Sequence, residues 1–300
     1  MILLRFILSL FLILSSTAFA NEIEFTVHHA PGGPSDKITR LLSKKLPQKY
    51  LVVNRPGAQG RIAVRHLLSN NTLMVATVPQ IFVTNFLQNT EPGYKEDDLE
   101  ILSVVGTMPS VLACNTKHNF YSFKDLMESS KSLNFGVAGY GSSEHIATEI
   151  LLKQFPNKHQ IVAYAQGGAA SLTDLLGGHI DCMFANYPLI KEHIIDTKRI
   201  RALITSHDLN LSIPDWRKEF KQNFPFQSVL AIVVSKQMSE ELKQQIQNNL
   251  ESIYNESLRA EVLEVGLFPV LSNSSKDINR VYLSNKQLRQ TIISNNLKLY

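Results

Sequence analysis

The sequence predicts an α/β protein with two lobes, each made of a sheet and the helices that cover it. Two observations support this prediction. Strand-like and helix-like segments alternate along the chain, and glycine-rich turns repeatedly join the end of a strand to the start of a helix. Chains with this alternation bury a mostly parallel sheet between layers of helices.

The first unit shows the alternation most clearly. Ile23, Phe25 and Val27 recur at every second residue, which is typical of a half-buried strand. Apolar residues then recur at helical spacing as far as Leu46. We predict strands over residues 23–27, 50–53 and 73–78, and helices over residues 36–46 and 62–68.

A second unit begins near Leu102. Its predicted strands cover residues 103–114, 134–138, 161–164, 180–184 and 200–205, and its predicted helices cover residues 123–130, 142–155, 169–176 and 189–195. A strand over 229–234 and one long helix over 239–258 follow; Ser239 is the expected N-cap, and Gly266 follows the helix end. Two units of this kind favour a ligand cleft between them.

The first twenty residues predict an export signal. One positive charge precedes an apolar run over residues 6–14, and Ala18-Phe19-Ala20 matches a cleavage site. The run is short for a transmembrane helix, although an uncleaved anchor is the alternative. We expect removal of residues 1–20 and a soluble, periplasmic mature chain without a membrane span.

Composition argues against two classes of function. Acidic and basic residues are interspersed, and the formal charge of +4 becomes +3 without Arg5 of the signal. Nucleic-acid binders carry a basic stripe, so no nucleic-acid partner is expected. The sequence has no H-E-x-x-H motif, and its histidines are scattered along the chain, so neither a metal nor a cofactor is expected.

The two cysteines, Cys114 and Cys182, both lie in apolar, strand-like runs. In an oxidising compartment they could pair. Their spacing matches no disulfide framework, so the sequence favours two buried free thiols.

The segment His28–Leu42 places Pro31-Gly32-Gly33-Pro34 between a strand and a helix. These residues end the strand, and Ser35 is the expected N-cap of a helix that begins at Asp36. The first N–H groups of a helix lack internal partners and carry partial positive charge, so a carboxylate or phosphate could bind there. A plain tight turn is the alternative, because no nucleotide-binding motif is present.

Two further turns repeat this arrangement. Gly139-Tyr140-Gly141-Ser142-Ser143 follows a predicted strand, and Tyr164-Ala165-Gln166-Gly167-Gly168 precedes a predicted helix. Ligands of open α/β sheets bind outside the carboxyl ends of the strands. Helix N-termini that face each other from opposite lobes would hold a dicarboxylate at both ends without an arginine.

Several blocks of the sequence carry a family resemblance: APGGPSDKITRLLSKKL, YLVVNRPGAQGRIAVRHL, GYGSSEHIATEILLKQF, IVAYAQGGAASLTDLLGGHIDCMFANYP and IRALITSHD. In this order, from Ile23 to about Pro269, the chain resembles the Bug/TctC extracytoplasmic solute-binding receptors of tripartite tricarboxylate transport. The resemblance implies a type II periplasmic-binding-protein fold with a closing cleft. Residues 21–103 and 226–300 would form lobe 1, and residues 104–225 lobe 2. It also implies a small organic acid as ligand, bound largely through backbone amides and water, and permease subunits as partners of a monomeric receptor.

The positions that match the family give the expected ligand contacts. In the first lobe they are Pro31, Gly32, Gly33, Pro34, Ser35, Asp36 and Thr77; in the second they are Gly139, Gly141, Ser142, Ser143, His145, Tyr164 and Asn186. Structural roles are the alternatives: the helix N-terminus for Asp36, capping for the serines, and packing for His145 and Tyr164.

Three further candidates depart from the family pattern. His28 and His29 stand where a proline and an aromatic or apolar residue are usual, and Ala185 stands where an aspartate is common. Compared with the usual family pattern, the chain has one acid fewer and two imidazoles more at these positions. We therefore predict a less negative pocket, and hence a more anionic or simply different ligand. Ordinary strand-end positions are the alternative for the histidines, and surface or turn positions are expected for Arg55 and Arg61.

Two other functions compete with transport. Ser142 or Ser143 with His145 resembles part of a hydrolase site, but G-x-S-x-G is absent, and the spacing at a helix start is poor for proton transfer. A periplasmic sensor that binds the same ligand and contacts a signalling partner is the second alternative. The sequence does not separate it from transport.

Overall fold

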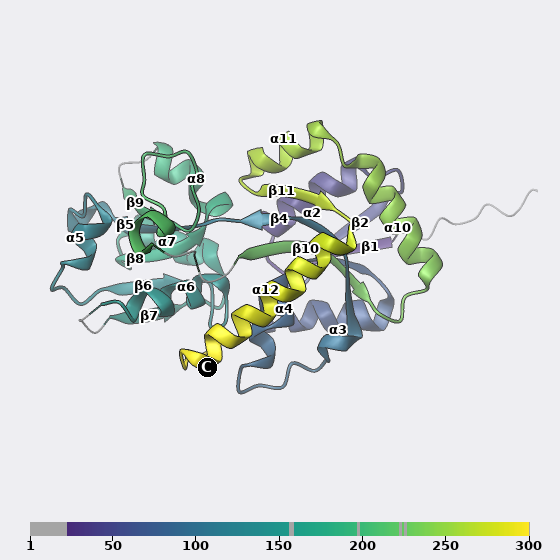
Figure 1. Ribbon diagram of the computed structural model, residues 1–300, viewed down its shortest axis with the longest axis horizontal. Helices are drawn as coiled ribbons and strands as arrows, with labels where there is room; N and C mark the ends of the chain where they lie inside the picture. Colours follow the sequence, from purple (N-terminus) through teal and green to yellow (C-terminus); the bar gives the residue numbers. More distant parts are fainter. Residues whose placement is uncertain (1–22, 156–158, 197–198, 222–223, 225–226, 300) are drawn as a thin grey trace, which may run out of the picture.

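The computed structural model describes residues 23–155, 159–196, 199–221, 224 and 227–299. The predicted export signal lies outside these residues. Two sheets with their helices lie side by side along the long axis of the molecule (Figure 1). We call the part around the six-stranded sheet the first lobe and the part around the five-stranded sheet the second lobe.

The six-stranded sheet has the order β11-β4-β10-β3-β1-β2. β1 pairs in parallel with β2 and β3, as the alternating pattern predicts, whereas β10 and β11 add antiparallel pairs. The strands are β1 (Ile23–Val27), β2 (Tyr50–Asn54), β3 (Leu73–Thr77), β4 (Leu99–Met108), β10 (Ser228–Ser235) and β11 (Phe268–Ser272).

Helices cover both faces of this sheet and bury an apolar core on each. One core contains Phe25 and Ile38, and the other contains Val64 and Met74. The helical elements are α2 (Pro34–Lys45), η1 (Ala58–Gly60), α3 (Arg61–Asn70), α4 (Val78–Phe82), η2 (Thr84–Phe86), η3 (Glu96–Asp98), α10 (Glu240–Ile253), α11 (Glu256–Val265) and α12 (Ser275–Ser294).

The second lobe is built around the order β7-β6-β8-β5-β9. Its strands are β5 (Ser110–Asn115), β6 (Asn134–Val137), β7 (Gln160–Ala163), β8 (Cys182–Asn186) and β9 (Ile200–Thr205). Its helical elements are η4 (Thr116–His118), α5 (Phe123–Met127), α6 (Ser143–Leu152), α7 (Gly168–Gly177), α8 (Tyr187–Asp196) and α9 (Trp216–Phe220). β6 pairs in parallel with β7 and β8, and β5 is antiparallel to both of its neighbours.

The chain passes from one lobe to the other where β4 leads to β5, and returns where β10 begins. The predicted division between residues 103 and 104 falls inside β4, all of which lies in the first sheet. The C-terminal helix α12 contacts both lobes (Figure 1). Val281 joins a first-lobe core, whereas Leu288 and Ile292 join the second-lobe core around Phe135.

The structure corrects two helix predictions. The long helix expected over residues 239–258 is two helices, because Tyr254 is extended and the Asn255 side chain accepts the Leu258 amide as the cap of α11. Gly266 ends α11 at φ 103°, and the longest described helix is α12. The first helix starts at Pro34 with Gly33 as N-cap, so Ser35 lies inside it, since proline fits the first helical position.

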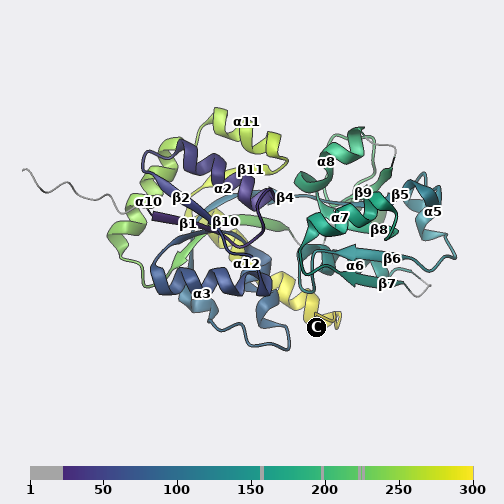
Figure 2. The same ribbon diagram turned by 180° about the vertical axis from the view of Figure 1, so that it is seen from behind.

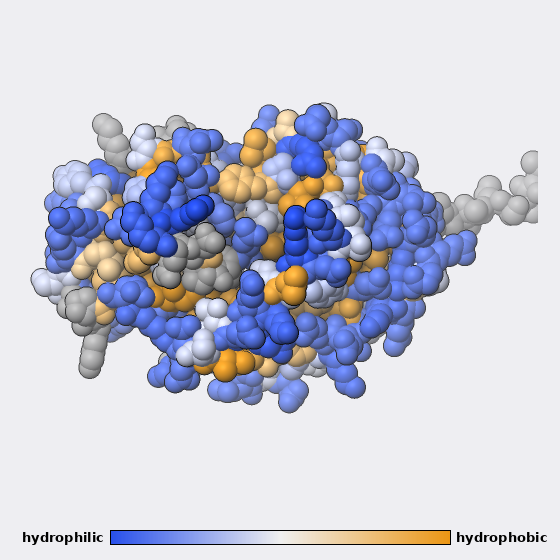
Figure 3. Space-filling view, in the orientation of Figure 1, coloured by the Kyte–Doolittle hydropathy of each residue, from blue (hydrophilic) through white to orange (hydrophobic). Residues whose placement is uncertain are grey.

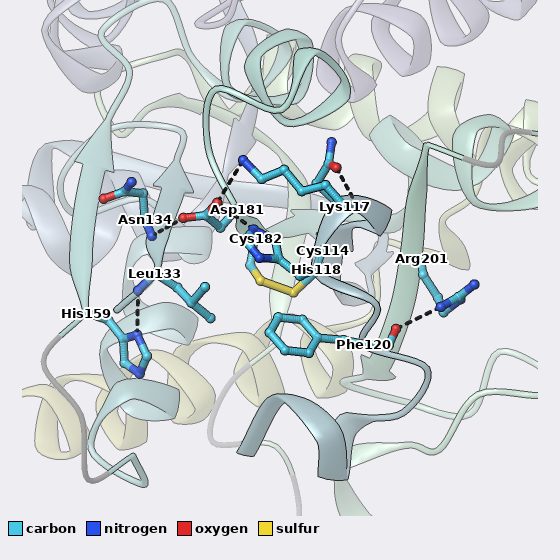
Figure 4. Close-up of a disulfide and its surroundings, with 11 residues drawn as sticks. Cys114, Lys117, His118, Phe120, Leu133, Asn134, His159, Asp181, Cys182 and Arg201 are labelled. Carbon is cyan, nitrogen blue, oxygen red and sulfur yellow. Dashed lines mark hydrogen bonds and ion pairs between the residues drawn. A yellow bond between two sulfur atoms is a disulfide. The ribbon is translucent and has the colours of Figure 1, made fainter. Parts of the chain in front are cut away.

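The interpretation of the cysteines as free thiols was wrong. Cys114 and Cys182 form a disulfide (Figure 4). They lie directly opposite each other in the antiparallel pair β5–β8, at the end of those strands far from Ser110 and Asn186. A separation of 68 residues hides this adjacency in the sequence. None of the described helices is both long and apolar enough to cross a bilayer.

Candidate ligand-binding site

The predicted ligand turns follow the carboxyl ends of parallel strands in both lobes. His28 follows β1, and Gly139 lies two residues beyond β6. Seen from behind, α2 of the first lobe and α7 of the second lie on the facing sides of the two lobes (Figure 2). The turn around Gly141 contacts the first lobe, because Gln88 Nε2 donates to Tyr140 O at 3.0 Å. The topology therefore brings two of the predicted turns to the boundary between the lobes.

The first-lobe turn leaves helix amides available. Pro34 has no N–H, so the unpaired donors in the first turn of α2 are the amides of Ser35 and Asp36. A Cβ at Gly33 would lie 3.6 Å from Ala30 O, and Gly33 has φ −73°, which any residue can adopt. This turn therefore needs no glycine at position 33 for its own folding.

Asp36 holds the first-lobe turn together. Its carboxylate accepts from the Gly32 amide (2.9 Å), Asn54 Nδ2 (2.9 Å) and Arg40 Nε (3.1 Å). Burial acts to raise the pKa of Asp36, but these hydrogen bonds outweigh it, so the pKa lies below its usual value. Asp36 and the Gly32 amide thus bond within the first lobe, and a ligand contact of either group stays a prediction.

The two histidines are neutral and packed together. His28 is 2 % exposed, and its Nε2 accepts the Thr77 amide at 2.9 Å, which links the ends of β1 and β3. The His29 ring lies 3.8 Å away, centroid to centroid, and its Nδ1 lies 3.1 Å from Ser35 Oγ. Burial lowers the pKa of His28 well below 6.5 and that of His29 to about 4. Neither ring supplies positive charge at neutral pH.

The second-lobe turn is a capped helix start. Ser142 is the N-cap of α6, and its Oγ accepts the His145 amide at 3.1 Å, which is the capping role expected as the alternative for this serine. The Gly141 amide donates to His145 Nδ1 at 3.1 Å, and the Ser142 amide donates to Gly139 O. The next two amides, of Ser143 and Glu144, head α6 and have no carbonyl partner inside the helix, and the Glu144 amide donates to its own carboxylate.

This geometry gives the serines no imidazole base. The ring of His145 turns Nδ1 to the Gly141 amide and Nε2 toward Glu149, 3.6 Å from its Oε1. The hydroxyl of Ser142 bonds the backbone of His145 rather than its ring. Activation of a serine needs a hydrogen bond between hydroxyl and imidazole, which these contacts replace.

A buried carboxyl group stands beside Asn186. Glu144 is 6 % exposed, its Oε1 accepts Asn186 Nδ2 at 2.7 Å, and its Oε2 accepts Ser143 Oγ at 3.2 Å. Burial raises the pKa of Glu144 and so favours the neutral form. Ala185 is fully buried and packs into the apolar core with Leu172. The second lobe therefore carries an acid at this edge although position 185 does not.

The third glycine turn is tied to its own lobe. Gly167, at φ 90°, caps α7, and the Tyr164 hydroxyl donates to Asp174 Oδ2 at 2.6 Å. Burial and this contact raise the pKa of Tyr164 to about 12. The hydroxyl of Tyr164 is thus directed to α7.

Several buried polar atoms of the described residues have no hydrogen-bond partner, and four belong to predicted ligand residues: His28 Nδ1, Thr77 Oγ1, His145 Nε2 and Asn186 Oδ1. Two of these four lie at strand ends in opposite lobes. Thr77 Oγ1 lies at the end of β3, and Asn186 Oδ1 lies at the end of β8. Buried polar atoms are normally paired, so each is available to a ligand or a water molecule. In the described part of the chain, no three His, Cys, Asp or Glu side chains are grouped to hold a metal.

A separate hollow of about 860 Å³ lies between the segment after β9 and α12. Its lining includes His207, Arg217 and Lys218 and none of the predicted ligand residues. The space-filling view shows the face that α12 crosses, which is mainly hydrophilic with scattered apolar residues (Figure 3). This hollow is distinct from the site of the glycine turns.

Comparison with known proteins decides the family. The model named "Tripartite tricarboxylate transporter family receptor" matches residues 36–298. The chain belongs to this receptor family. The receptor is 28% identical over 208 residues to a UPF0065 protein of the tcbD-tcbE intergenic region of a Pseudomonas species, and 29% identical over 209 residues to protein BugT of Bordetella pertussis. These matches cover 65% of the receptor and 61% and 64% of the two relatives, so the receptor spans less than two thirds of their length.

Solved structures share the two-lobed fold of the receptor. The periplasmic binding protein BugD superposes with a TM-score of 0.80 at 16% identity, covering 92% of the receptor and 98% of BugD. A Rhodopseudomonas palustris protein solved with malate gives 0.77 at 17% identity, covering 90% and 98%. An R. palustris protein solved with adipate gives 0.83 at 21% identity, covering 92% and 97%. The predicted fold class, the periplasmic-binding-protein fold, is confirmed.

Sequence reasoning missed two residues near the receptor's second-lobe turn. Arg61 was expected at the surface or in a turn, but it is 7 % exposed and bonds Gln88, which reaches the turn. Glu144 looks like an ordinary acid in the first turn of a helix. Its one sequence signal is its place directly after the Ser-Ser pair, and its burial beside Asn186 depends on the fold of β8.

Proposed function

We propose that this receptor is an exported, periplasmic protein that captures a small organic acid between its lobes and delivers it, as a monomer, to the permease subunits of a tripartite transporter. One observation carries the proposal. Two helix N-termini whose first amides lack a carbonyl partner in the helix, Ser35–Asp36 in α2 and Ser143–Glu144 in α6, follow strand ends at the boundary between the lobes.

Each helix start suits one end of an acid. Unpaired N–H groups and the helix dipole favour a negative group without a cation. Hydrogen bonds to a charged group contribute about 1.5–3 kcal/mol each, so a few of them reach about 8 kcal/mol, which is micromolar affinity. Thr77 Oγ1 and Asn186 Oδ1 add one unpaired polar atom from each lobe.

The structures of related fold support the same ligand class. One contains adipate and another malate, both of which are dicarboxylates. Burial favours the protonated form of Glu144, and a carboxyl in that form can donate a hydrogen bond to an acidic ligand. We propose a dicarboxylate as the ligand, with one carboxylate at each helix start.

Gly33→Val tests the first of these contacts. Valine can adopt the backbone angles of Gly33, and its Cβ makes only an ordinary contact, so the variant should fold normally. We expect wild-type protein, but not Gly33→Val, to show a rise in unfolding temperature with adipate, malate or another acid of a carboxylate panel. Lys44→Val adds the same side chain at the far end of α2, at an exposed position, and should bind like wild type. Wild-type affinity in Gly33→Val would exclude this turn as a contact.

A further inference from the structure

The side chain of Gln88 joins three segments that are distant in the sequence. Gln88 follows η2 of the first lobe and is partly buried. Its Nε2 lies 2.6 Å from Gln59 Oε1, 3.0 Å from Tyr140 O and 3.3 Å from Leu299 O. These oxygens belong to a first-lobe loop, the second-lobe ligand turn and the C-terminal end of the chain.

Arg61 fixes the orientation of this amide. Arg61 Nη2 donates to Gln88 Oε1 at 2.5 Å. A guanidinium has only donors, so the atom that faces it must be the amide oxygen, and the –NH2 group must face the three acceptors. Arg61 is itself 7 % exposed and starts α3, which gives the pair a rigid base in the first lobe.

The second-lobe turn is shaped to admit Gln88. A Cβ at Gly141 would lie 2.5 Å from Gln88 Nε2 and 3.2 Å from Gln59 Oε1. Gly141 also has φ +77°, a backbone conformation that glycine adopts without strain. A glycine at this position therefore serves the contact between the lobes as well as the turn itself.

We propose that Gln88 is a positioning residue that holds the Gly139–Ser142 turn, and with it the first amides of α6, against the first lobe when the receptor is closed. The proposal rests on the proposed function, since it assigns Gln88 a role in the same site. Gln88 also donates a hydrogen bond to Leu299 O, so the same side chain holds the C-terminal end of the chain beside the second-lobe turn in the closed receptor. Apparent affinity falls in proportion to the closed, binding-competent fraction, so loss of this contact weakens binding without removal of a ligand contact.

The test compares Gln88→Glu and Gln88→Ala with wild type. Glutamate keeps the size of the side chain and an acceptor for Arg61. It has no N–H donor, so it removes the hydrogen bonds to Gln59 Oε1, Tyr140 O and Leu299 O together. We expect both variants without ligand to show a larger radius of gyration in X-ray scattering. We also expect affinity for adipate or malate, measured by calorimetry, to fall about fivefold to tenfold, as loss of one or two hydrogen bonds predicts. Gln290→Ala, at an exposed position of α12, is the control and should match wild type.

The two measurements separate this proposal from the proposed function. If wild type binds no acid of the panel, the proposed ligand is wrong, while scattering still tests the role of Gln88. If Gln88→Glu has the radius of gyration and the affinity of wild type, the Gln88 proposal is overturned and the receptor function is untouched. A fall in affinity at an unchanged radius would also overturn it, because the effect would not come from closure. Unfolding temperatures of both variants show that they are folded.

Discussion

Removal of the disulfide gives a prediction whose size follows from its place in the chain. Cys114 and Cys182 are 68 residues apart, and they join β5 to β8 in the middle of the second-lobe sheet. A crosslink that closes a loop of this length lowers the entropy of the unfolded chain enough to stabilise the native state by about 4 kcal/mol. The free energy of unfolding of the double variant Cys114→Ala/Cys182→Ala should therefore be about 4 kcal/mol lower than that of the oxidised wild type.

Urea unfolding with and without a phosphine reductant measures this difference. The reductant should shift the midpoint of wild type toward that of the double variant and leave the double variant unchanged. Ligand affinity should stay within about twofold of wild type, because the disulfide lies at the strand ends far from Ser110 and Asn186. Two thiols that react with a thiol reagent in urea before any reduction, or a stability loss below about 1 kcal/mol, would refute the reasoning.

Two further predictions concern titrating groups at the site. Burial raises the pKa of Glu144, so the folded receptor holds this proton more firmly than the unfolded chain, and wild type loses stability as pH rises through the folded pKa. Glu144→Gln should have a higher unfolding temperature than wild type at pH 8 and a similar unfolding temperature at pH 4. The same difference in unfolding temperature at both pH values would count against a buried acid. Burial lowers the pKa of His29 to about 4, so the contribution of the neutral ring to the free energy of unfolding is present above pH 6.5 and is lost as pH falls toward 4. His29→Asn should reduce the change in unfolding free energy between pH 7 and pH 4 by at most about 3 kcal/mol, because solvent screens this partly exposed ring. If denaturant titrations show the same pH dependence of unfolding free energy in the variant and in wild type, this prediction is contradicted.

Local patterns predicted much of the fold and part of the site. Alternating and helical periodicities located most strands and helices, and Ser142 caps α6 as its sequence context indicates. These features depend on neighbours within a few residues. The break at Tyr254–Asn255 was missed because the apolar stripe continues through it, although Asn255 is a good capping residue.

Contacts between distant segments could not be predicted. Cys114 meets Cys182 only because β5 and β8 are adjacent and antiparallel. Gln88 has no motif around it, and its importance appears only when Tyr140 and Leu299 are placed beside it. Glu144 becomes a buried acid only once β8 brings Asn186 to it. Register and lobe packing, which determine these contacts, depend on the whole chain.

The most direct measurement is a crystal structure of the mature receptor with the tightest-binding acid of the panel. We expect one carboxylate within about 3 Å of the amides of Ser35 or Asp36 and another within about 3 Å of those of Ser143 or Glu144. An acid bound in the hollow beside His207, or held by the guanidinium of Arg61 rather than by the helix starts, would contradict the account.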